Sequence, residues 1–383
     1  MAQPTTLRLR ALWFQVHKWI GLLLAILIIP LSLSGAALVW HDALDEALHP
    51  GRYAVSGEPG LPPSAYQAAA QGALGPGTRI VSLRYPEHGH GPMLAAAVSA
   101  GRGDGERGPP ARTNIWLAPA DARVLDVASS NAGPVRFLHV LHGSLQVPGA
   151  GRQIVGWIGV FMFVSCLTGI WLWWPVTGSV RRGLRWKRQN STNANLHHQM
   201  GFWILIPLAM LSFTGAWISF PGVFGRFEAA QPRGKAGPPD RMRAMRARPL
   251  ARTAMTADQA LAAAQPHATG ALVTIAWPTD QAPAWKMSFA RSGGPAEVEI
   301  ADATGAVTPP RPPRPETNAR LMRRLHDGTG MGALWQTMIF IGGIIPALLA
   351  VTGLVMWLRS RGWRAALARR RKAKATLRQQ PAE

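Results

Sequence analysis

The sequence predicts an α-helical integral membrane protein with four transmembrane helices in two repeats, and with two small α+β modules on one side of the membrane. Three observations support this prediction. Four long stretches contain no Asp, Glu, Lys or Arg, many of the 41 Lys and Arg residues lie beside these stretches, and the second half of the chain aligns with the first. The single cysteine excludes an internal disulfide framework, a cysteine-based zinc site and an iron–sulfur cluster.

The predicted transmembrane helices cover residues 19–40, 153–176, 198–220 and 334–358. At 1.5 Å per residue, each is long enough to cross a hydrocarbon core of about 30 Å. Four buried helices of a soluble bundle would need a polar face on at least some helices, and these stretches have none. The first stretch also resembles a signal peptide, but a near-copy of it recurs in the middle of the chain, so we expect it to remain in the mature protein.

The net charge of +22 first suggests a nucleic-acid-binding protein. The positions of the charges indicate otherwise, because residues 1–18, 177–197 and 359–383 hold 17 of the 41 basic residues and one acidic residue. Short basic segments remain in the cytoplasm. Both termini and the 177–197 loop are therefore predicted to be cytoplasmic, and residues 41–152 and 221–333 to lie on the outer side. We expect membrane lipids as partners of the basic tail, and no nucleic acid.

Two offsets align the halves of the chain without gaps. An offset of 180 residues matches His17 with His197 and Ser34-Gly35 with Thr214-Gly215; an offset of 184 matches His142 with His326 and Thr168-Gly169 with Thr352-Gly353. The Ser/Thr-Gly pairs let helix backbones approach closely and add a hydroxyl that can bond a carbonyl. The chain is therefore predicted to contain two copies of one unit, which consists of a span, an outer segment and a second span.

Each outer segment has the pattern of a helix followed by short strands. The first is predicted to have a helix from Pro63 and strands at 78–85, 93–98, 113–117 and 123–127. The second is predicted to have a helix with Thr256 as its N-cap, strands near 271–277, 284–290 and 296–301, and a last short strand after a turn at Asp302. The stretches 99–112 and 229–250 are rich in Gly, Pro and Arg and are typical of linkers. We have no account of the basic cluster Arg233–Arg248.

Four sequence motifs carry a family resemblance: HKWIGL from His17, FLHVLHG from Phe137, LHHQMGFW from Leu196 and LHDGTG from Leu325. With the helix–strand modules, they resemble the PepSY-associated transmembrane (PepSY-TM) family over nearly the whole chain. Within that family, the arrangement of four spans is similar to the bacterial inner-membrane ferric-siderophore reductases, with the ferrioxamine reductase as the best parallel. The resemblance implies PepSY-like periplasmic modules, a place in the bacterial inner membrane, and two haem b groups as cofactors.

The repeat selects four of the eleven histidines as candidate haem ligands. His17 and His197 occupy equivalent positions at the cytoplasmic ends of spans one and three, and His142 and His326 at the outer ends of spans two and four. Ionisable residues at membrane depth are costly and mark function, and two imidazoles at one depth can hold a haem iron from both faces. The alternative is that interfacial histidines extend to lipid headgroups. Reserve ligands are His139, His198 and His41.

The remaining candidates have two interpretations each. Arg152, Arg320, Arg323 and Arg324 are suited to pair with haem propionates or with lipid headgroups. The run from Glu87 to His90 could bind a transition metal or be exposed to solvent. Cys166 is expected to be an inert buried thiol. The basic tail from Arg359 to Arg378 is suited to anchor on anionic lipid, with docking of an electron donor as the alternative.

These predictions define an oxidoreductase: a di-haem b inner-membrane reductase that passes electrons from a cytoplasmic donor or the quinol pool to a periplasmic ferric siderophore and releases ferrous iron. No catalytic residue beyond the haem ligands is predicted. One alternative keeps the haems and changes the periplasmic acceptor. A second is a non-enzymatic protein whose PepSY modules bind peptides or a partner. A permease is disfavoured, because none of the four spans contains a carboxylate.

Overall fold

A computed structural model describes residues 5–86, 91–99, 112–174, 180–186, 189–227, 247–292, 294–312 and 316–378. These residues form two compact units. The helical unit comprises Met1–His41, Leu138–Ala229 and Glu316–Glu383, and the sheet unit comprises Asp42–Phe137 and Ala230–Pro315. Each unit is therefore assembled from segments that are distant in the sequence.

Four long helices form the helical unit: α1 (Thr5–Val39), α6 (Gly151–Trp173), α8 (Thr192–Ser219) and α13 (Gly332–Arg378). All four are long and apolar enough to cross a membrane. Large apolar side chains point outward, as with Leu23 and Ile26, which are 71% and 80% exposed. Lipid, rather than protein, is the solvent that suits such a surface.

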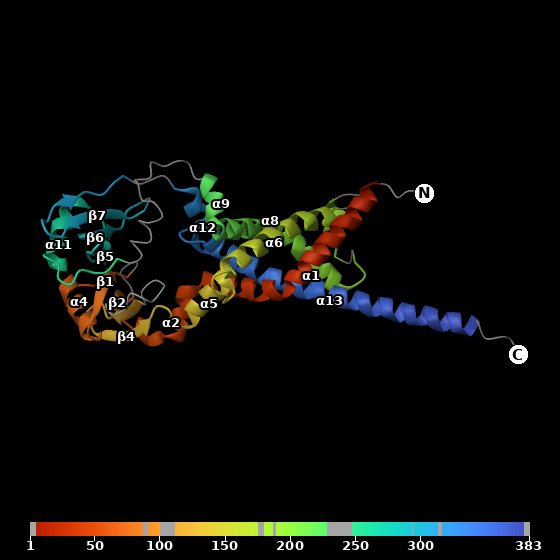
Figure 1. The fold of residues 1–383 in the computed structure, drawn as a ribbon, viewed down its shortest axis with the longest axis horizontal. Coiled ribbons are helices and arrows are strands. Elements are labelled where there is room, and N and C mark those ends of the chain that lie inside the picture. The colour runs from red at the N-terminus through yellow and green to blue at the C-terminus, as the bar shows by residue number, and fades with distance from the viewer. Residues whose placement is uncertain are drawn as a thin grey trace. The chain divides into compact units, whose positions relative to one another are not determined.

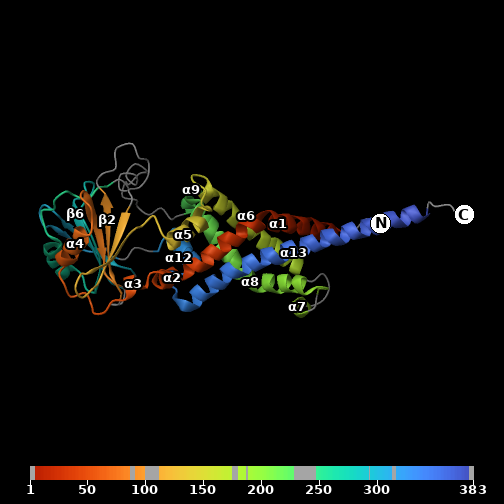
Figure 2. The ribbon, with the colours of Figure 1, turned by 90° about the horizontal axis from the view of Figure 1, so that it is seen from below.

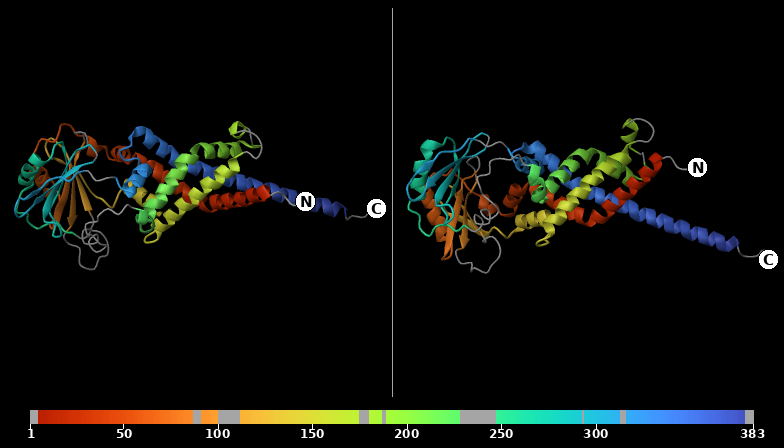
Figure 3. Two further views of the ribbon diagram at one scale, coloured as in Figure 1. Left: turned by 90° about the horizontal axis from the view of Figure 1, so that it is seen from above. Right: turned by 45° about the horizontal axis from the view of Figure 1, so that its top comes forward.

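Two of these helices extend beyond the predicted spans. Helix α1 begins at Thr5 rather than at residue 19, and α13 continues past residue 358 to Arg378. The added turns contain Arg, Lys, Ala and Leu, which are good helix formers, and residues 363–378 contain no proline or glycine that would stop the second helix. Figure 3 shows the blue end of α13 running past the other three long helices.

Short helices connect the long ones. They are α5 (Pro134–Ser144), α7 (Val180–Gly183), α9 (Pro221–Phe224), η2 (Gly225–Phe227) and α12 (Asn318–Asp327). Helix α12 begins at the N-cap Thr317 and ends at Gly328, whose φ of 78° favours glycine. Figure 1 shows α5, α9 and α12 at one end of the helical unit, whereas α1 begins and α13 ends at the opposite end.

Glycines allow two close crossings between the long helices. A Cβ added to Gly159 of α6 would lie 2.9 Å from the Ser212 carbonyl oxygen of α8. A Cβ added to Gly343 of α13 would lie 3.0 Å from the Ser32 carbonyl oxygen of α1. Under the offsets of 184 and 180 residues, these two crossings use corresponding positions. Close approach at small residues replaces hydrophobic association, which lipid does not supply.

The sheet unit contains one antiparallel sheet of eight strands in the order β4-β3-β2-β1-β5-β6-β7-β8. The first outer segment supplies β1 (Thr78–Arg84), β2 (Met93–Ser99), β3 (Arg112–Leu117) and β4 (Val124–Ser129). The second supplies β5 (Leu272–Ala276), β6 (Ala284–Phe289), β7 (Ala296–Ala301) and β8 (Val307–Thr308). The strands thus lie close to their predicted positions.

The two predicted modules are joined into a single sheet, which the sequence did not predict. Strands β1 and β5 pair, with Leu83 opposite Ile275. Helices α4 (Pro63–Gly72) and α11 (Ala257–Ala264), the latter followed by the 3-10 helix η3 (Gln265–His267), lie on one face of the sheet (Figure 2). Helix α11 begins with the predicted N-cap Thr256, which forms a capping box. Pairing removes two exposed strand edges from the separate modules.

A buried arginine fixes the connection that enters the sheet unit, formed by α2 (His41–Leu48) and α3 (Pro50–Tyr53). Arg52 is 8% exposed and its guanidinium lies 4.0 Å from the Trp116 ring. Its Nε donates to Asp126 Oδ2 at 2.6 Å and its Nη1 to Asp45 Oδ1 at 3.2 Å. The bond from Arg52 lowers the pKa of the Asp126 carboxyl below its ordinary value. This cluster attaches α3 to β3 and β4.

Candidate functional site

His17 and His197 form the first of two histidine pairs, which we call the spanning-helix pair. His17 lies on α1 and His197 on α8, and their ring centroids are 6.4 Å apart with ring planes at 86°. Neither residue is exposed. The structure thus brings together the two histidines that the 180-residue offset matches.

His142 and His326 form the second pair, which we call the short-helix pair. They lie on α5 and α12, the short helices that precede α6 and α13, and not on the long helices themselves. Their ring centroids are 6.0 Å apart and the ring planes are tilted by 39°. Both side chains are partly buried. These are the two histidines that the 184-residue offset matches.

Threonine hydroxyls fix the tautomer of the spanning-helix pair. Thr352 Oγ1 donates its hydrogen to the Leu348 carbonyl at 2.8 Å, so it can only accept from His197 Nδ1, which lies 2.9 Å away. His17 Nδ1 likewise lies 3.0 Å from Thr168 Oγ1, which donates to the Ser165 carbonyl. The hydrogen is therefore on Nδ1 in both rings, and the lone pair that can bind a metal is on Nε2.

The short-helix pair has the same tautomer but reaches it in two ways. His326 Nδ1 lies 2.9 Å from Thr214 Oγ1, and Thr214 donates to the Met210 carbonyl at 2.8 Å. His142 Nδ1 instead donates directly to the Leu31 carbonyl at 2.9 Å. Ser34 corresponds to Thr214, but its hydroxyl donates to the Pro30 carbonyl. Three rings thus have a threonine hydroxyl at Nδ1, and His17 also has the Ser165 carbonyl at 3.2 Å, whereas His142 has the Leu31 carbonyl.

A glycine lies against each of the four rings. An added Cβ would lie 2.6 Å from His142 Cε1 at Gly35, 3.2 Å from His326 Cε1 at Gly215, and 3.3 Å from His17 Cε1 at Gly169. At Gly353 the distance to His197 Cε1 would be 3.5 Å. The glycines of the Ser/Thr-Gly pairs therefore contact the histidine rings, a role that we did not predict for them. The sequence signal that could have predicted this contact is that each span has one such pair, and that the same offsets match the pairs and the histidines.

The spacing of both pairs fits an iron ion bound between two imidazoles. A bond of about 2 Å from the metal to each ring nitrogen separates the centroids by about 6–6.5 Å, and the observed separations are 6.4 and 6.0 Å. The glycines one turn after His17 and His197 have open surroundings. An added Cβ at Gly21, one turn after His17, would meet no atom within 4 Å, and one at Gly201 would meet only Leu349, at 3.9 Å.

No cluster of three or more His, Cys, Asp or Glu side chains that could hold a metal ion occurs within the part of the chain that the structure describes. The candidate site is therefore two pairs of imidazoles, each ring held from behind by a hydrogen bond. Such an arrangement supplies two axial ligands to a metal that brings its own equatorial ligands, as haem does. The run from Glu87 to His90 lies outside the described residues.

The reserve ligands have ring neighbours other than the four candidate ligands. His198 stacks on Trp173, with ring centroids 6.2 Å apart and planes at 29°. His41 and His139 lie beside each other, with ring centroids 6.0 Å apart and planes at 55°. Both His41 and His139 are exposed, unlike the four ligand candidates.

Two of the four predicted arginines have a protein partner that fixes the side chain. Arg324 forms an ion pair with Glu316, with Nη1 2.9 Å from Oε1, and Arg152 donates through Nη2 to the Ile218 carbonyl. Arg320 and Arg323 lie on α12, the helix that carries His326, and both side chains are exposed. Cys166 is buried in α6, as predicted. Contact of these arginines with propionates stays a prediction.

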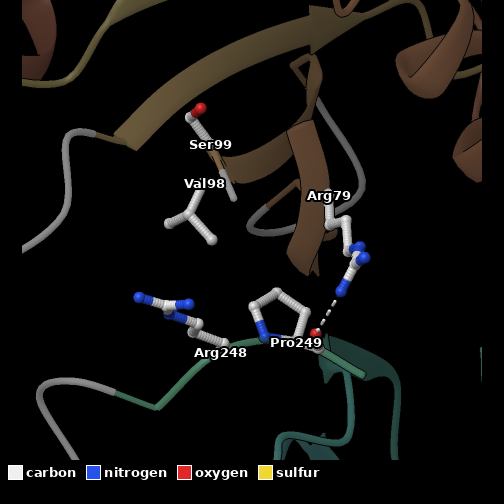
Figure 4. A pocket seen from close by; sticks show the side chains of 5 residues that line it. All are labelled: Arg79, Val98, Ser99, Arg248 and Pro249. Carbon is white, nitrogen blue, oxygen red and sulfur yellow. Dashed lines mark hydrogen bonds between the residues drawn. The ribbon is translucent and has the colours of Figure 1, made fainter. Parts of the chain in front are cut away.

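A separate small pocket lies in the sheet unit and is lined by Arg79, Val98, Ser99, Arg248 and Pro249. Figure 4 shows the Arg79 guanidinium pointing to the Pro249 carbonyl, to which Nη1 donates at 3.1 Å. Arg248 is the one member of the Arg233–Arg248 cluster inside the described residues. Its backbone N–H donates to Asp280 Oδ1 at 2.8 Å.

Four helices able to cross a membrane, a separate antiparallel sheet and two partly buried histidine pairs define a multi-pass helical membrane protein with α+β parts. A family model describes this class. The PepSY-associated TM region matches residues 14–360, so the chain belongs to the PepSY-TM family, as its motifs predicted. A search of curated proteins found no match.

Proposed function

We propose that the protein is a di-haem b reductase of the bacterial inner membrane, which passes electrons from a cytoplasmic donor or from quinol to a periplasmic ferric siderophore. The observation that supports it most is the pair of bis-imidazole arrangements at 6.4 and 6.0 Å, each with the tautomer that leaves Nε2 for a metal. His17 and His197 would hold one haem, and His142 and His326 the other. Haem, when bound, supplies a one-electron centre at each pair.

The protein's own residues need only position these centres. The Nδ1 hydrogen bonds orient the four rings, and the apolar surroundings of the bundle exclude water. The reaction is the transfer of one electron to ferric iron, which becomes ferrous iron, and no proton transfer by a side chain is required. Hard oxygen ligands prefer the ferric ion, so reduction favours release of the metal.

The separation of the two pairs suits transfer across a membrane. On α1, His17 and the Leu31 carbonyl that binds His142 are 14 residues apart, which corresponds to about 21 Å along the helix axis. On α8, His197 and Thr214 are 17 residues apart, or about 25 Å. The pairs thus occupy two levels within a hydrocarbon core of roughly 30 Å.

The proposed orientation rests on charge and on the positions of the helix ends. The beginning of α1 and the end of α13 lie at the same end of the helical unit (Figure 1), as four crossings require. By the positive-inside rule we assign that end to the cytoplasm, and we accordingly assign α5, α12 and the two outer segments to the periplasm. The matched crossings at Gly159 and Gly343 support two repeats of one unit.

A pyridine haemochromogen assay on protein made in haem-replete cells tests this proposal. We expect two b-type haems per chain and the absorption spectrum of low-spin bis-histidine haem. Protein that folds in the membrane without haem would contradict the proposal. The acceptor is tested separately, by comparing the rates at which ferric siderophores and other oxidants reoxidise the dithionite-reduced protein. Equal rates for unrelated oxidants would favour another acceptor over a siderophore.

A further inference from the structure

A third histidine pair, His41 and His139, has the same spacing as the two candidate haem pairs. Its ring centroids are 6.0 Å apart, against 6.4 and 6.0 Å for the other two. His41 begins α2 and His139 lies on α5. The two positions are not matched by the repeat, because His139 corresponds to Arg323 and His41 to Pro221.

The surroundings of this pair differ from those of the haem pairs in two ways. Both rings are exposed, whereas His17, His142, His197 and His326 are not. The glycines that lie against histidine rings in the helical unit, Gly35, Gly169, Gly215 and Gly353, all lie against the other four rings. An exposed pair of imidazoles suits a hydrated metal ion, which needs no cavity, better than a porphyrin.

We propose that His41 and His139 bind a divalent first-row transition metal ion, with water completing its coordination. Two ring nitrogens at about 2 Å from one ion place the ring centroids about 5–6.5 Å apart, depending on the angle at the metal. Imidazole nitrogen suits iron, nickel, copper and zinc, while magnesium and calcium prefer oxygen. Binding is a ligand exchange in which two imidazole nitrogens replace two waters, and no electron is transferred.

The position of this site gives it a role that rests on the proposed function. His139 precedes His142 by three residues on α5, and residues at this spacing share a helix face. The metal site therefore lies one helical turn from the pair at which electrons leave. Ferrous iron, released there from hard oxygen ligands, would find two nitrogen ligands that suit it. We infer that His41 and His139 receive the ferrous product.

Zinc is the first probe, because it has no redox chemistry and prefers nitrogen ligands. We would titrate Zn²⁺ by isothermal calorimetry into the haem-loaded full chain in detergent, in an H88A/H90A background, so that these two histidines cannot contribute to binding. The double variant H41A/H139A should bind one equivalent of zinc less than this background. Each single variant should weaken zinc affinity at that site by more than about tenfold. Loss of a hydrogen-bond partner of a metal ligand already costs about 10–100-fold, and loss of a ligand itself should cost at least as much.

The matched control is His267→Ala, which removes an exposed histidine of the sheet unit and should leave zinc binding unchanged. Anaerobic Fe²⁺ should compete with zinc at the same equivalent. Unchanged zinc stoichiometry in H41A/H139A would overturn the proposal. So would loss of haem in H139A, which would make His139 a haem ligand. Because zinc binding is measured without reductase turnover, it can succeed even if the siderophore proposal fails.

Discussion

The spanning-helix pair and the short-helix pair have nearly the same spacing but are held by different parts of the fold. His17 and His197 lie within α1 and α8, and each donates to a threonine on the neighbouring long helix. His142 and His326 lie on short helices and reach back to α1 and α8. The first pair is therefore positioned by packing inside the bundle, and the second by connecting segments whose helix ends must be fixed.

Positive φ angles occur just after both short helices that carry the short-helix pair. Helix α12 ends at Gly328 with φ of 78°, and α5 is followed by Leu145 and Gln146 with φ of 51° and 59°. Non-glycine residues rarely adopt such angles. At these positions the chain turns sharply, from α5 into α6 and from α12 into α13.

Replacing a ligand should have the largest effect on either pair. In H197A or H17A the haem content should fall from two to one per chain, and the remaining haem should be the one at the short-helix pair. H142A or H326A should remove the other. Loss of one axial imidazole abolishes bis-histidine ligation and with it the low-spin spectrum at that site. The pyridine haemochromogen assay measures the number of haems per chain. A difference in redox midpoint potential between the two classes of variant shows which haem remains.

His198→Ala is the matched control for H197A. It changes the adjacent ring, which stacks on Trp173, and should leave two haems bound. If H198A lost a haem and H197A did not, the ligand assignment at the spanning-helix pair would be wrong.

Alanine at the four ring-contacting glycines should affect the two pairs unequally. The added methyl would lie 2.6 Å from the His142 ring in G35A but 3.5 Å from the His197 ring in G353A. The first distance requires the ring or α1 to move, and the second is an ordinary contact. We expect G35A to lose the haem of the short-helix pair and G353A to retain both. Haem stoichiometry of the two purified variants measures this, and equal retention would contradict the contact geometry.

The sequence predicted the elements better than their contacts. Repeated motifs selected His17, His142, His197 and His326, which the structure brings together in pairs, and alternation and capping placed the strands and the start of α11 at Thr256. Pairing of β1 with β5 could not be predicted, because an alternating strand has the same pattern at the edge of a sheet as in its middle. The roles of the threonines were also hidden, because a Thr-Gly pair in an apolar helix is equally suited to helix packing alone.

Removing a threonine hydroxyl should have a smaller effect than removing a ligand. T352V, T168V and T214V each remove one acceptor from a histidine Nδ1, and for metal-binding histidines the loss of such a partner lowers metal affinity by about 10–100-fold. Ser34→Ala is the matched control, because Ser34 corresponds to Thr214 but donates to Pro30, while His142 uses the Leu31 carbonyl. Haem dissociation rates to an apo-myoglobin trap should rise in the three threonine variants and stay unchanged in S34A.

Arg52→Met should leave both histidine pairs unchanged and weaken only the sheet unit. The substitution removes the charge-assisted hydrogen bonds to the carboxylates of Asp126 and Asp45, which we estimate at roughly 1–2 kcal/mol because Asp126 is 39% exposed. Hydrogen exchange of β3 and β4 should therefore speed up, while haem content stays at two. Arg123→Met is the matched control, because Arg123 and its partner Asp121 are 64% and 60% exposed and lie 3.8 Å apart.

The pH dependence of the same variant distinguishes the ion pair from simple packing on Trp116. Because Arg52 lowers the pKa of Asp126 below 3.8 in the folded protein, the pair stabilises the sheet unit fully above that value. The stabilisation is lost as the pH falls through the lowered pKa, when Asp126 becomes protonated. The difference in exchange rate between wild type and R52M should therefore be constant from neutral pH to about pH 5 and shrink below pH 4. A difference that persists in full at pH 2 would assign the role of Arg52 to its contact with Trp116.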